Sequence, residues 1–263
     1  MELCSIAKKN MREPAEDHFS KIAPQYARGR LGYPGELFDF LLAHCPGRKL
    51  AWDCATGSGQ AAVDLAGRFS QVIATDISAE LLALAPTHPK ITFRLAPAEN
   101  SGIEADSVDL ITVAQAVHWF DLRRFWTEVL RVLRGEGVMA IWGYTWPLVS
   151  ARVDRVLEDL KGVLVPFWPE RSAILHAGYR DLSPPLREIV CPKFEASARW
   201  DLNGYLSHME SWSAIRYHRE VTNKDLLGQF RSEFARAWTE RTMVVRWPLV
   251  VRVFRKGGPT VRT

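Results

Sequence analysis

The fold of this chain is decided by the stretch Asp53-Cys54-Ala55-Thr56-Gly57-Ser58-Gly59-Gln60, which joins a predicted strand to a predicted helix. Residues 50–52 are apolar and indicate a short buried strand that ends at Asp53, and residues 60–69 follow with a helical pattern. The two glycines of the turn let its backbone approach a ligand closely, because glycine has no Cβ. A strand, a glycine-rich turn and a helix in this order predict one unit of a parallel sheet with a ligand at the turn.

Asp76 ends the next predicted strand, residues 72–75, and lies about 20 residues beyond the turn, where an acidic residue typically accepts hydrogen bonds from ribose hydroxyls. The turn departs from the complete dinucleotide pattern, because Ala62 occupies the third glycine position. Asp53 beside the turn would also repel a diphosphate, which the start of a helix otherwise attracts. A ligand with a ribose and an amino group but no phosphate therefore fits this turn better than a dinucleotide.

Strands and helices alternate along the first 145 residues. Further strands are expected at 91–95, 108–114 and 137–143, and a helix is expected at 122–133. Ser78 is expected to cap a short helix after the second strand. This alternation predicts the α/β class, with a Rossmann-like, mostly parallel sheet that helices cover on both faces. Ligands of such sheets bind outside the carboxyl ends of the strands, so the loops that follow the strands are expected to form one site.

The patterns divide the chain into three segments. Residues 1–145 form the expected Rossmann-like core. Residues 146–240 lose the alternation and are expected to be a mainly helical lid insertion over the site, with a helix at 202–215 and another capped by Thr222. Residues 241–263 include a stretch rich in Val, Trp and Phe, which is expected to return to the core sheet as one or two strands.

The composition is typical of a soluble globular protein, with 47% hydrophobic and 24% charged residues among 263. The net charge of +4 is small and spread out, so no nucleic-acid partner is expected. Neither a signal-peptide pattern nor an apolar segment long enough to span a bilayer is found, so no membrane association is expected. The 4 cysteines lack zinc or redox-motif spacing, which favours reduced thiols in a cytoplasmic protein without a metal.

The chain resembles the class I S-adenosylmethionine-dependent methyltransferases, in particular the group with a methyltransferase type 11 domain that includes trans-aconitate methyltransferase. The resemblance covers residues 15–145 and implies S-adenosyl-L-methionine as the cofactor. Four motifs carry it, in order and at predicted strand ends: Asp53-x-Ala55-Thr56-Gly57-Ser58-Gly59, Asp76-Ile77-Ser78, Ala96-Pro97-Ala98-Glu99 and Gln115-Ala116-Val117-His118-Trp119-Phe120-Asp121.

The resemblance also implies which residues bind the cofactor. The methionine part is assigned to the glycine turn and the end of the fourth strand, through Asp53, Ala55, Gly57, Gly59, Ala114 and Gln115. Asp76 is assigned to the ribose hydroxyls, and Ile77, Ala98 and Glu99 are assigned to the adenine. Tyr26 and Arg30 belong to an N-terminal segment that folds over the cofactor in this family. Pro97 stands where many members have Asp, so a side-chain bond to the adenine amino group is not implied.

The acceptor is expected to bind above the same strand ends. His118 and Trp119 follow the fourth strand directly and are candidates for contact with it. Aromatic rings attract cations such as a sulfonium, so rings of the lid insertion are further candidates, although ordinary core packing is the alternative for them. The residues of the insertion predicted to contact the acceptor are Trp146, Tyr205, Trp212, Arg216 and Tyr217.

The predicted function is methyl transfer to a small molecule, with a carboxylate oxygen as the favoured acceptor. No acid–base pair is recognisable, and a carboxylate is already deprotonated at neutral pH, so alignment and exclusion of water suffice. The alternatives are a phenol, amine or carbon acceptor, for which His118 is the candidate base, and a catalytically inactive cofactor-binding protein. A nicotinamide-dependent oxidoreductase would require a complete dinucleotide fingerprint, which is absent. The oligomeric state is left open.

Overall fold

The computed structural model describes residues 32–257 of the chain, and all structural statements concern these residues. Their strands form one 8-stranded sheet in the order β3-β2-β1-β4-β5-β8-β6, and β7 also pairs with β8. The strands are β1 (Leu50–Cys54), β2 (Gln71–Asp76), β3 (Ile91–Leu95), β4 (Val108–Ala114), β5 (Leu133–Tyr144), β6 (Arg187–Ile189), β7 (Phe194–Trp200) and β8 (Met243–Arg255).

Strands β1 to β5 are parallel, and β8 pairs antiparallel with β5, β6 and β7. The chain builds the sheet outward from β1 to β3 and then returns to the other side of β1 with β4. The strand order therefore reverses between β1 and β4. In sheets of this kind the crevice at that point, outside the carboxyl ends of the strands, is where ligands bind. The predicted Rossmann-like α/β fold is confirmed.

The core follows from the alternation of side chains along the strands, which sends successive residues to opposite faces. Ala51 packs with α3 and α4 on one face, whereas its neighbour Trp52 packs with α6 on the other. Both faces are covered, which explains why most residues of the central strands are apolar. The helices of this part are α3 (Gly35–His44), α4 (Gln60–Ala66), α5 (Ala79–Leu82) and α6 (Leu122–Val132).

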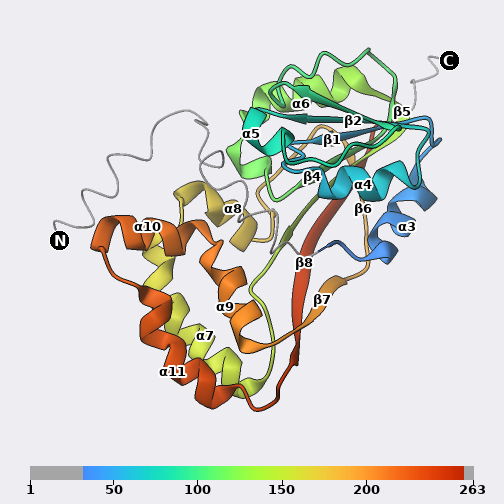
Figure 1. Cartoon of the computed structure of the whole chain (residues 1–263). Coiled ribbons are helices and arrows are strands. Elements are labelled where there is room, and N and C mark those ends of the chain that lie inside the picture. The colour runs from blue at the N-terminus through green and yellow to red at the C-terminus, as the bar shows by residue number, and fades with distance from the viewer. Residues whose placement is uncertain (1–31, 258–263) are drawn as a thin grey trace.

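A second layer of helices lies beyond the C-terminal ends of β5 and β7 and the N-terminal end of β8 (Figure 1). Its apolar side chains, such as Leu157 and Phe234, belong to the same buried cluster as the α3 and α4 face of the sheet. The helical layer and the sheet thus share one continuous core. The elements of this layer and its connections are α7 (Ala151–Leu164), η3 (Val165–Phe167), η4 (Glu170–Ser172), α8 (Ala173–His176), α9 (Leu202–Glu210), α10 (Ser213–Thr222) and α11 (Leu226–Ala237).

Some local predictions are confirmed and others are wrong. Ser78 caps α5, because its hydroxyl accepts a hydrogen bond from the N–H of Leu81 at 3.2 Å. Thr222 is the last residue of α10 rather than a cap, and Asp225 caps α11 by accepting from the N–H of Gly228. The expected helix at 202–215 is divided into α9 and α10. The strands β6 and β7 lie inside the segment predicted as mainly helical and were not anticipated.

Candidate active site

The glycine turn follows β1 in an unusual backbone conformation. Gly57 and Gly59 have φ angles of 58° and 85°, in the left-handed region that glycine adopts at little cost. A Cβ on Gly59 would lie 3.0 Å from the ring of Phe93, so this position also excludes side chains by close packing. Ala55 is left-handed as well, with φ 55°, although it carries a Cβ. Strained backbone of this kind is held by the surrounding structure and clusters at functional sites.

Asp76 holds the turn from the neighbouring strand. Its carboxylate accepts hydrogen bonds from the N–H of Gly57 at 2.8 Å and from the N–H of Ser78 at 2.9 Å. An ionised carboxylate has about four lone-pair positions, so it can accept several hydrogen bonds at once. The turn after β1 and the end of β2 are therefore joined at the acidic residue predicted to bind a ribose.

Asp53 lies beneath the turn and is only 1% exposed. Its carboxylate accepts hydrogen bonds from the hydroxyls of Thr56 in the turn and Thr112 in β4. Burial raises the pKa of this carboxyl to about 6. Asp53 thus fixes the turn to β1 and β4, and it places a negative charge under the site rather than at its surface.

The residues that follow β2 and β3 provide apolar surface. Ile77 is 49% exposed and Leu95 is 64% exposed, which is unusual for large aliphatic side chains at the end of a buried sheet. Ala98, which lies close to these residues in the sequence, is buried. The carboxylate of Glu99 accepts a hydrogen bond from the N–H of Asp121 at 2.8 Å, so it secures the residue that caps α6. The exposed part of Ile77 is available to a flat apolar ligand.

Gln115 begins the loop after β4. It is left-handed, with φ 61°, and its N–H donates to the carbonyl oxygen of Trp142 in β5 at 2.8 Å. Ala114, before it, ends β4 in register with Trp142. Ala55 and Gln115 therefore bring two left-handed non-glycine residues to the carboxyl ends of β1 and β4, where the strand order reverses.

A cavity of about 200 Å3 opens beside Gln115 between the sheet and the helical layer. The residues predicted for the site that line this cavity are Gln115, His118, Trp119, Trp146, Trp212 and Arg216. Further lining residues, which the sequence did not single out as acceptor contacts, include Tyr33, Gln60, Tyr144, Trp168, His208 and Trp247.

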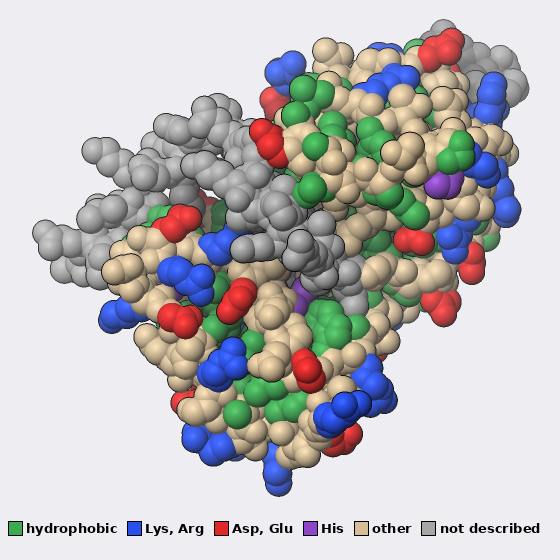
Figure 2. All heavy atoms as spheres, in the orientation of Figure 1, with side chains coloured by type: hydrophobic (Ala, Val, Ile, Leu, Met, Phe, Trp, Pro, Cys, Tyr) green, Lys and Arg blue, Asp and Glu red, His purple; other side chains and the backbone are tan. Residues whose placement is uncertain are grey.

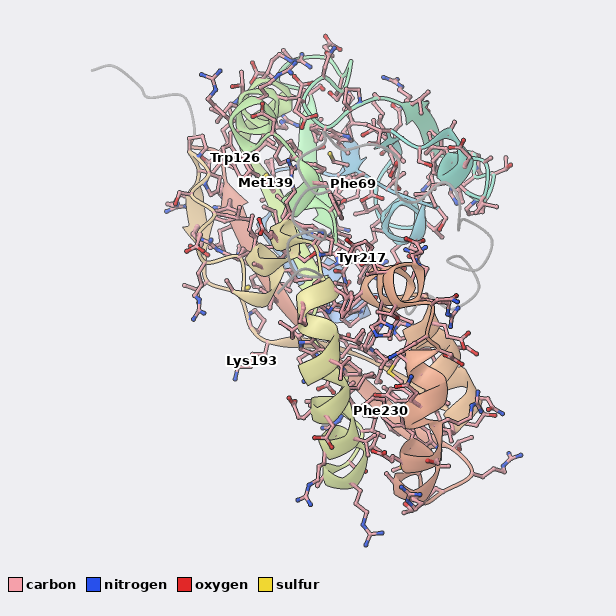
Figure 3. All side chains as sticks on the ribbon, turned by 90° about the vertical axis from the view of Figure 1, so that its left-hand side faces the viewer. Phe69, Trp126, Met139, Lys193, Tyr217 and Phe230 are labelled. Atoms are coloured by element: carbon pink, nitrogen blue, oxygen red, sulfur yellow. The ribbon has the colours of Figure 1, made fainter. Side chains whose placement is uncertain are left out.

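Two of the predicted acceptor residues lie elsewhere. Tyr205 is fully buried on α9 and packs against Phe234 and Trp238, with ring centroids 5.8 and 5.4 Å apart. Tyr217 packs against Phe167, with centroids 6.2 Å apart, at the end of the helical layer nearer the sheet (Figure 3). Neither lines the cavity, because both rings fill spaces between helices. The predicted cofactor residues Tyr26 and Arg30 lie outside the described residues.

Three indole rings meet at one corner of the cavity. Trp146 lies 5.9 Å from Trp168 and 5.4 Å from Trp212, both in edge-to-face geometry, and Trp168 lies 6.4 Å from Trp212. All three line the cavity and are partly exposed, in contrast to Trp52 and Trp142, which are fully buried. The Trp146/Trp168/Trp212 cluster therefore presents aromatic surface to the cavity.

Arg216 brings a positive charge to the same cavity. It lies on α10, and burial lowers the pKa of its guanidinium from the usual value. Its Nε is buried and has no hydrogen-bond partner among the described residues. No Asp or Glu side chain of residues 32–257 lines the cavity beside it. A buried N–H without an acceptor is costly, so the site is suited to an anionic ligand group.

Comparisons with known proteins agree with this geometry. A family model described as a methyltransferase domain matches residues 52–141, which run from β1 into β5. A Dictyostelium discoideum protein named as a methyltransferase is 30% identical over 85% of this chain and 87% of its own length. A solved structure from Anaeromyxobacter dehalogenans, described as a type II methyltransferase, is 38% identical, covers 88% of this chain and 99% of its own, and has a TM-score of 0.83.

The chain belongs to the class I S-adenosylmethionine-dependent methyltransferases. A yeast relative named as an S-adenosylmethionine-dependent methyltransferase, CRG1 of Saccharomyces cerevisiae, is 33% identical over 49% of this chain and 45% of its own length. The cofactor of this methyltransferase is accordingly S-adenosyl-L-methionine, as predicted. The trans-aconitate subgroup is not identified by these relatives and stays a prediction.

The strand-end residues of the methyltransferase fit that cofactor. Gly57 and Gly59 give the turn its left-handed backbone, the carboxylate of Asp76 holds that turn at the strand ends, and Ile77 exposes an apolar side chain there. The buried charge of Asp53 favours a cationic ligand and disfavours a diphosphate. Among the described residues no group of three or more His, Cys, Asp or Glu could hold a metal ion. No helix within residues 32–257 is long and apolar enough to cross a membrane.

Proposed function

We propose that this methyltransferase methylates a carboxylate oxygen of a small organic acid. The observation that supports the acceptor class is Arg216, a partly buried residue with a buried Nε, which lines a cavity that no Asp or Glu of the described residues lines. An arginine fork can hold a carboxylate by two hydrogen bonds. The acidic neighbour of Arg216 is Glu220, which does not line the cavity, so a cationic acceptor would meet the positive charge of Arg216 there.

The chemistry of a carboxylate suits this cavity. When bound, S-adenosyl-L-methionine supplies a methyl group already activated on a sulfonium. The carboxylate oxygen bonds to the methyl carbon while the carbon–sulfur bond breaks and its electron pair stays on sulfur, which leaves S-adenosylhomocysteine and a methyl ester. No proton is released, so no general base is needed. The opposite charges of the reactants cancel in this step, so a cavity whose lining is rich in aromatic rings favours it over bulk water.

The proposed cofactor contacts are those assigned by sequence. Gly57 and Gly59 would surround the methionine part, Asp76 would accept from the ribose hydroxyls, and Ile77 would cover the adenine. Gln115 lines the acceptor cavity and also follows β4, so it would lie between cofactor and acceptor. Calorimetry should show that S-adenosylhomocysteine binds and that NAD does not. Binding of NAD without S-adenosylhomocysteine would contradict this assignment.

A phenol, amine or carbon acceptor is the second candidate, because His118 lines the cavity and is 9% exposed. A histidine in that position could remove the proton that these acceptors lose on methylation. We further propose a cytoplasmic protein without a nucleic-acid partner. In support, basic and acidic side chains are interspersed on the face seen in Figure 2 rather than gathered by sign.

A screen of organic acids, phenols and amines with methyl-labelled S-adenosyl-L-methionine separates these candidates. A product that hydrolyses in mild base is a carboxyl ester, whereas methyl ethers and methylamines persist. We expect a base-labile product that Arg216→Ala loses and His118→Ala retains. A base-stable product that is lost in His118→Ala and retained in Arg216→Ala would replace the carboxylate proposal by base-assisted transfer.

A further inference from the structure

The residues that line the acceptor cavity bear on the chemical class of the acceptor as well as on its charge. Rings supply much of the lining, from β5, β8 and the helical layer, and the Trp146/Trp168/Trp212 cluster is the largest group of them in mutual contact. Saturated acids need only a shape-matched apolar wall, which Leu or Val would provide. Perpendicular indole rings offer both edges and faces, which is the arrangement that aromatic ligands favour.

Trp212 and Arg216 lie four residues apart at the start of the same helix, α10. Trp212 is the N-cap of α10, and its carbonyl oxygen accepts a hydrogen bond from the N–H of Arg216 at 3.3 Å. Residues four apart lie above one another on one helix face, about 5–6 Å apart. Both side chains line the cavity. They can therefore contact a ring and a carboxylate that are directly bonded or separated by one or two carbons.

A cationic acceptor does not explain this aromatic surface. The ammonium of Lys161 already lies 4.8 Å from the centroid of Trp146, so that ring has a cation of the protein on one face. Arg216 supplies a second positive charge within the cavity, and no carboxylate of the described residues lines it to balance a cationic acceptor. All three rings of the cluster pack against the core and still keep part of their surface exposed at the cavity.

We propose that the acceptor is an aromatic carboxylic acid whose ring lies against the Trp146/Trp168/Trp212 cluster while its carboxylate bonds to Arg216. This proposal rests on the proposed function and narrows it to one class of acid. One carboxylate oxygen accepts from the guanidinium, and the other remains for the methyl group. The aromatic cluster selects the ring, and Arg216 selects the charge.

Matched pairs of acids test the ring requirement. Benzoate and phenylacetate are compared with cyclohexanecarboxylate and cyclohexylacetate, which have the same charge and carbon number but no aromatic ring. We expect kcat/KM to favour the aromatic member by about tenfold. Trp212→Leu should bring the ratio close to one, and Trp212→Phe should retain most of it. Trp126→Leu, on α6 and outside the cavity lining (Figure 3), should leave the ratio unchanged.

The outcomes separate this inference from the function on which it rests. Equal methylation of aromatic and saturated acids, or a preference that Trp212→Leu retains, would overturn the aromatic proposal and leave carboxyl methylation intact. If no acid gives a base-labile product, calorimetry of the same pairs on the S-adenosylhomocysteine complex still measures the ring preference. Aromatic acids that bind about tenfold more tightly would then support the subsite while the carboxyl-transfer proposal fails, and absent or equal binding would refute the subsite.

Discussion

The carboxylate of Asp76 accepts a hydrogen bond of 2.8 Å from the backbone N–H of Gly57, so the end of β2 fixes the turn that follows β1. The same carboxylate accepts from the N–H of Ser78. One acidic residue thus shapes the glycine turn from the end of the neighbouring strand. A change at Asp76 should therefore act on ligand affinity and on the geometry of the turn together.

Asp76→Asn should weaken the binding of S-adenosylhomocysteine by at least about tenfold, and Asp76→Ala by more. Hydrogen bonds to charged groups contribute about 1.5–3 kcal/mol, and about 1.4 kcal/mol corresponds to a factor of ten. The fold should survive, which circular dichroism checks, and calorimetry measures the affinity. Asp159→Asn, at an exposed position of α7, is the control and should bind normally. Parent-like affinity in Asp76→Ala would refute the ribose assignment.

Gly59→Ala should lower both the stability and the affinity for S-adenosylhomocysteine. The left-handed backbone alone costs a side chain about 1–2 kcal/mol, and the new Cβ would also lie 3.0 Å from Phe93. Gly102→Ala is a matched control, because Gly102 has φ 66° but no heavy atom within 4 Å of the added Cβ. Gly102→Ala should lose a similar amount of stability through its left-handed backbone and keep normal affinity for S-adenosylhomocysteine. Chemical denaturation and calorimetry on both variants check this, and equal effects on affinity would contradict it.

Asp53 should make the protein less stable as the pH rises from about 4 to above 6. Burial raises the pKa of its carboxyl to about 6 from a usual value of 3.8, so the folded state favours the protonated form. The stability that this gives is complete below the unfolded pKa and is lost as the pH rises through the folded pKa. The difference of about two pH units corresponds to about 3 kcal/mol.

The measurement for Asp53 is the unfolding free energy of the parent and of Asp53→Asn between pH 4 and pH 8. Other titrating groups contribute equally to both proteins, so the difference isolates Asp53. The variant should gain stability relative to the parent across this range. A difference that does not change with pH would show that Asp53 titrates normally in the folded protein.

Cofactor binding should protect the backbone before α3 from hydrogen exchange. Tyr33 lines the acceptor cavity and stacks on Tyr144 with ring centroids 5.3 Å apart, so the first described residues of the chain lie at the site. We expect exchange in residues 18–34 to slow when S-adenosylhomocysteine is added, because Tyr26 and Arg30 are predicted to cover the cofactor. Residues 226–237 of α11 serve as the internal reference. Unchanged exchange at 18–34 would argue against a covering role.

The core could be predicted from sequence because its signals are local. The apolar run before Asp53, the glycines after it and the cap at Ser78 each fix a strand, turn or helix through neighbouring residues. The strands β6 and β7 were missed because their pattern is weak. β6 has only three residues, and β7 is an edge strand, Phe194–Trp200, in which small and polar residues predominate. Their strand conformation depends on pairing with β8, which is distant in sequence.

Which side chains line the acceptor cavity was harder to predict from the sequence. Tyr205 and Trp212 have similar surroundings in the sequence, yet one ring is buried against Phe234 and the other lines the cavity. His208 and Trp168 gave no sequence signal for contact with an acceptor, and they reach the cavity because the helical layer folds back beside the sheet. The direction of a side chain on an amphipathic helix depends on which neighbour packs against it.

By itself, the sequence determined the alternation of strands and helices, the glycine turn and the acidic residue at the end of β2, and the resemblance that these motifs carry implied the methyltransferase family and its cofactor. These features depend on short-range geometry: the period of apolar residues, the conformational freedom of glycine and the reach of a carboxylate across two adjacent strands. Only the tertiary structure decided that Trp146, Trp168, Trp212 and Arg216 share one cavity. Their meeting depends on packing between segments far apart in the chain, and no local periodicity encodes which of several aromatic faces remains exposed.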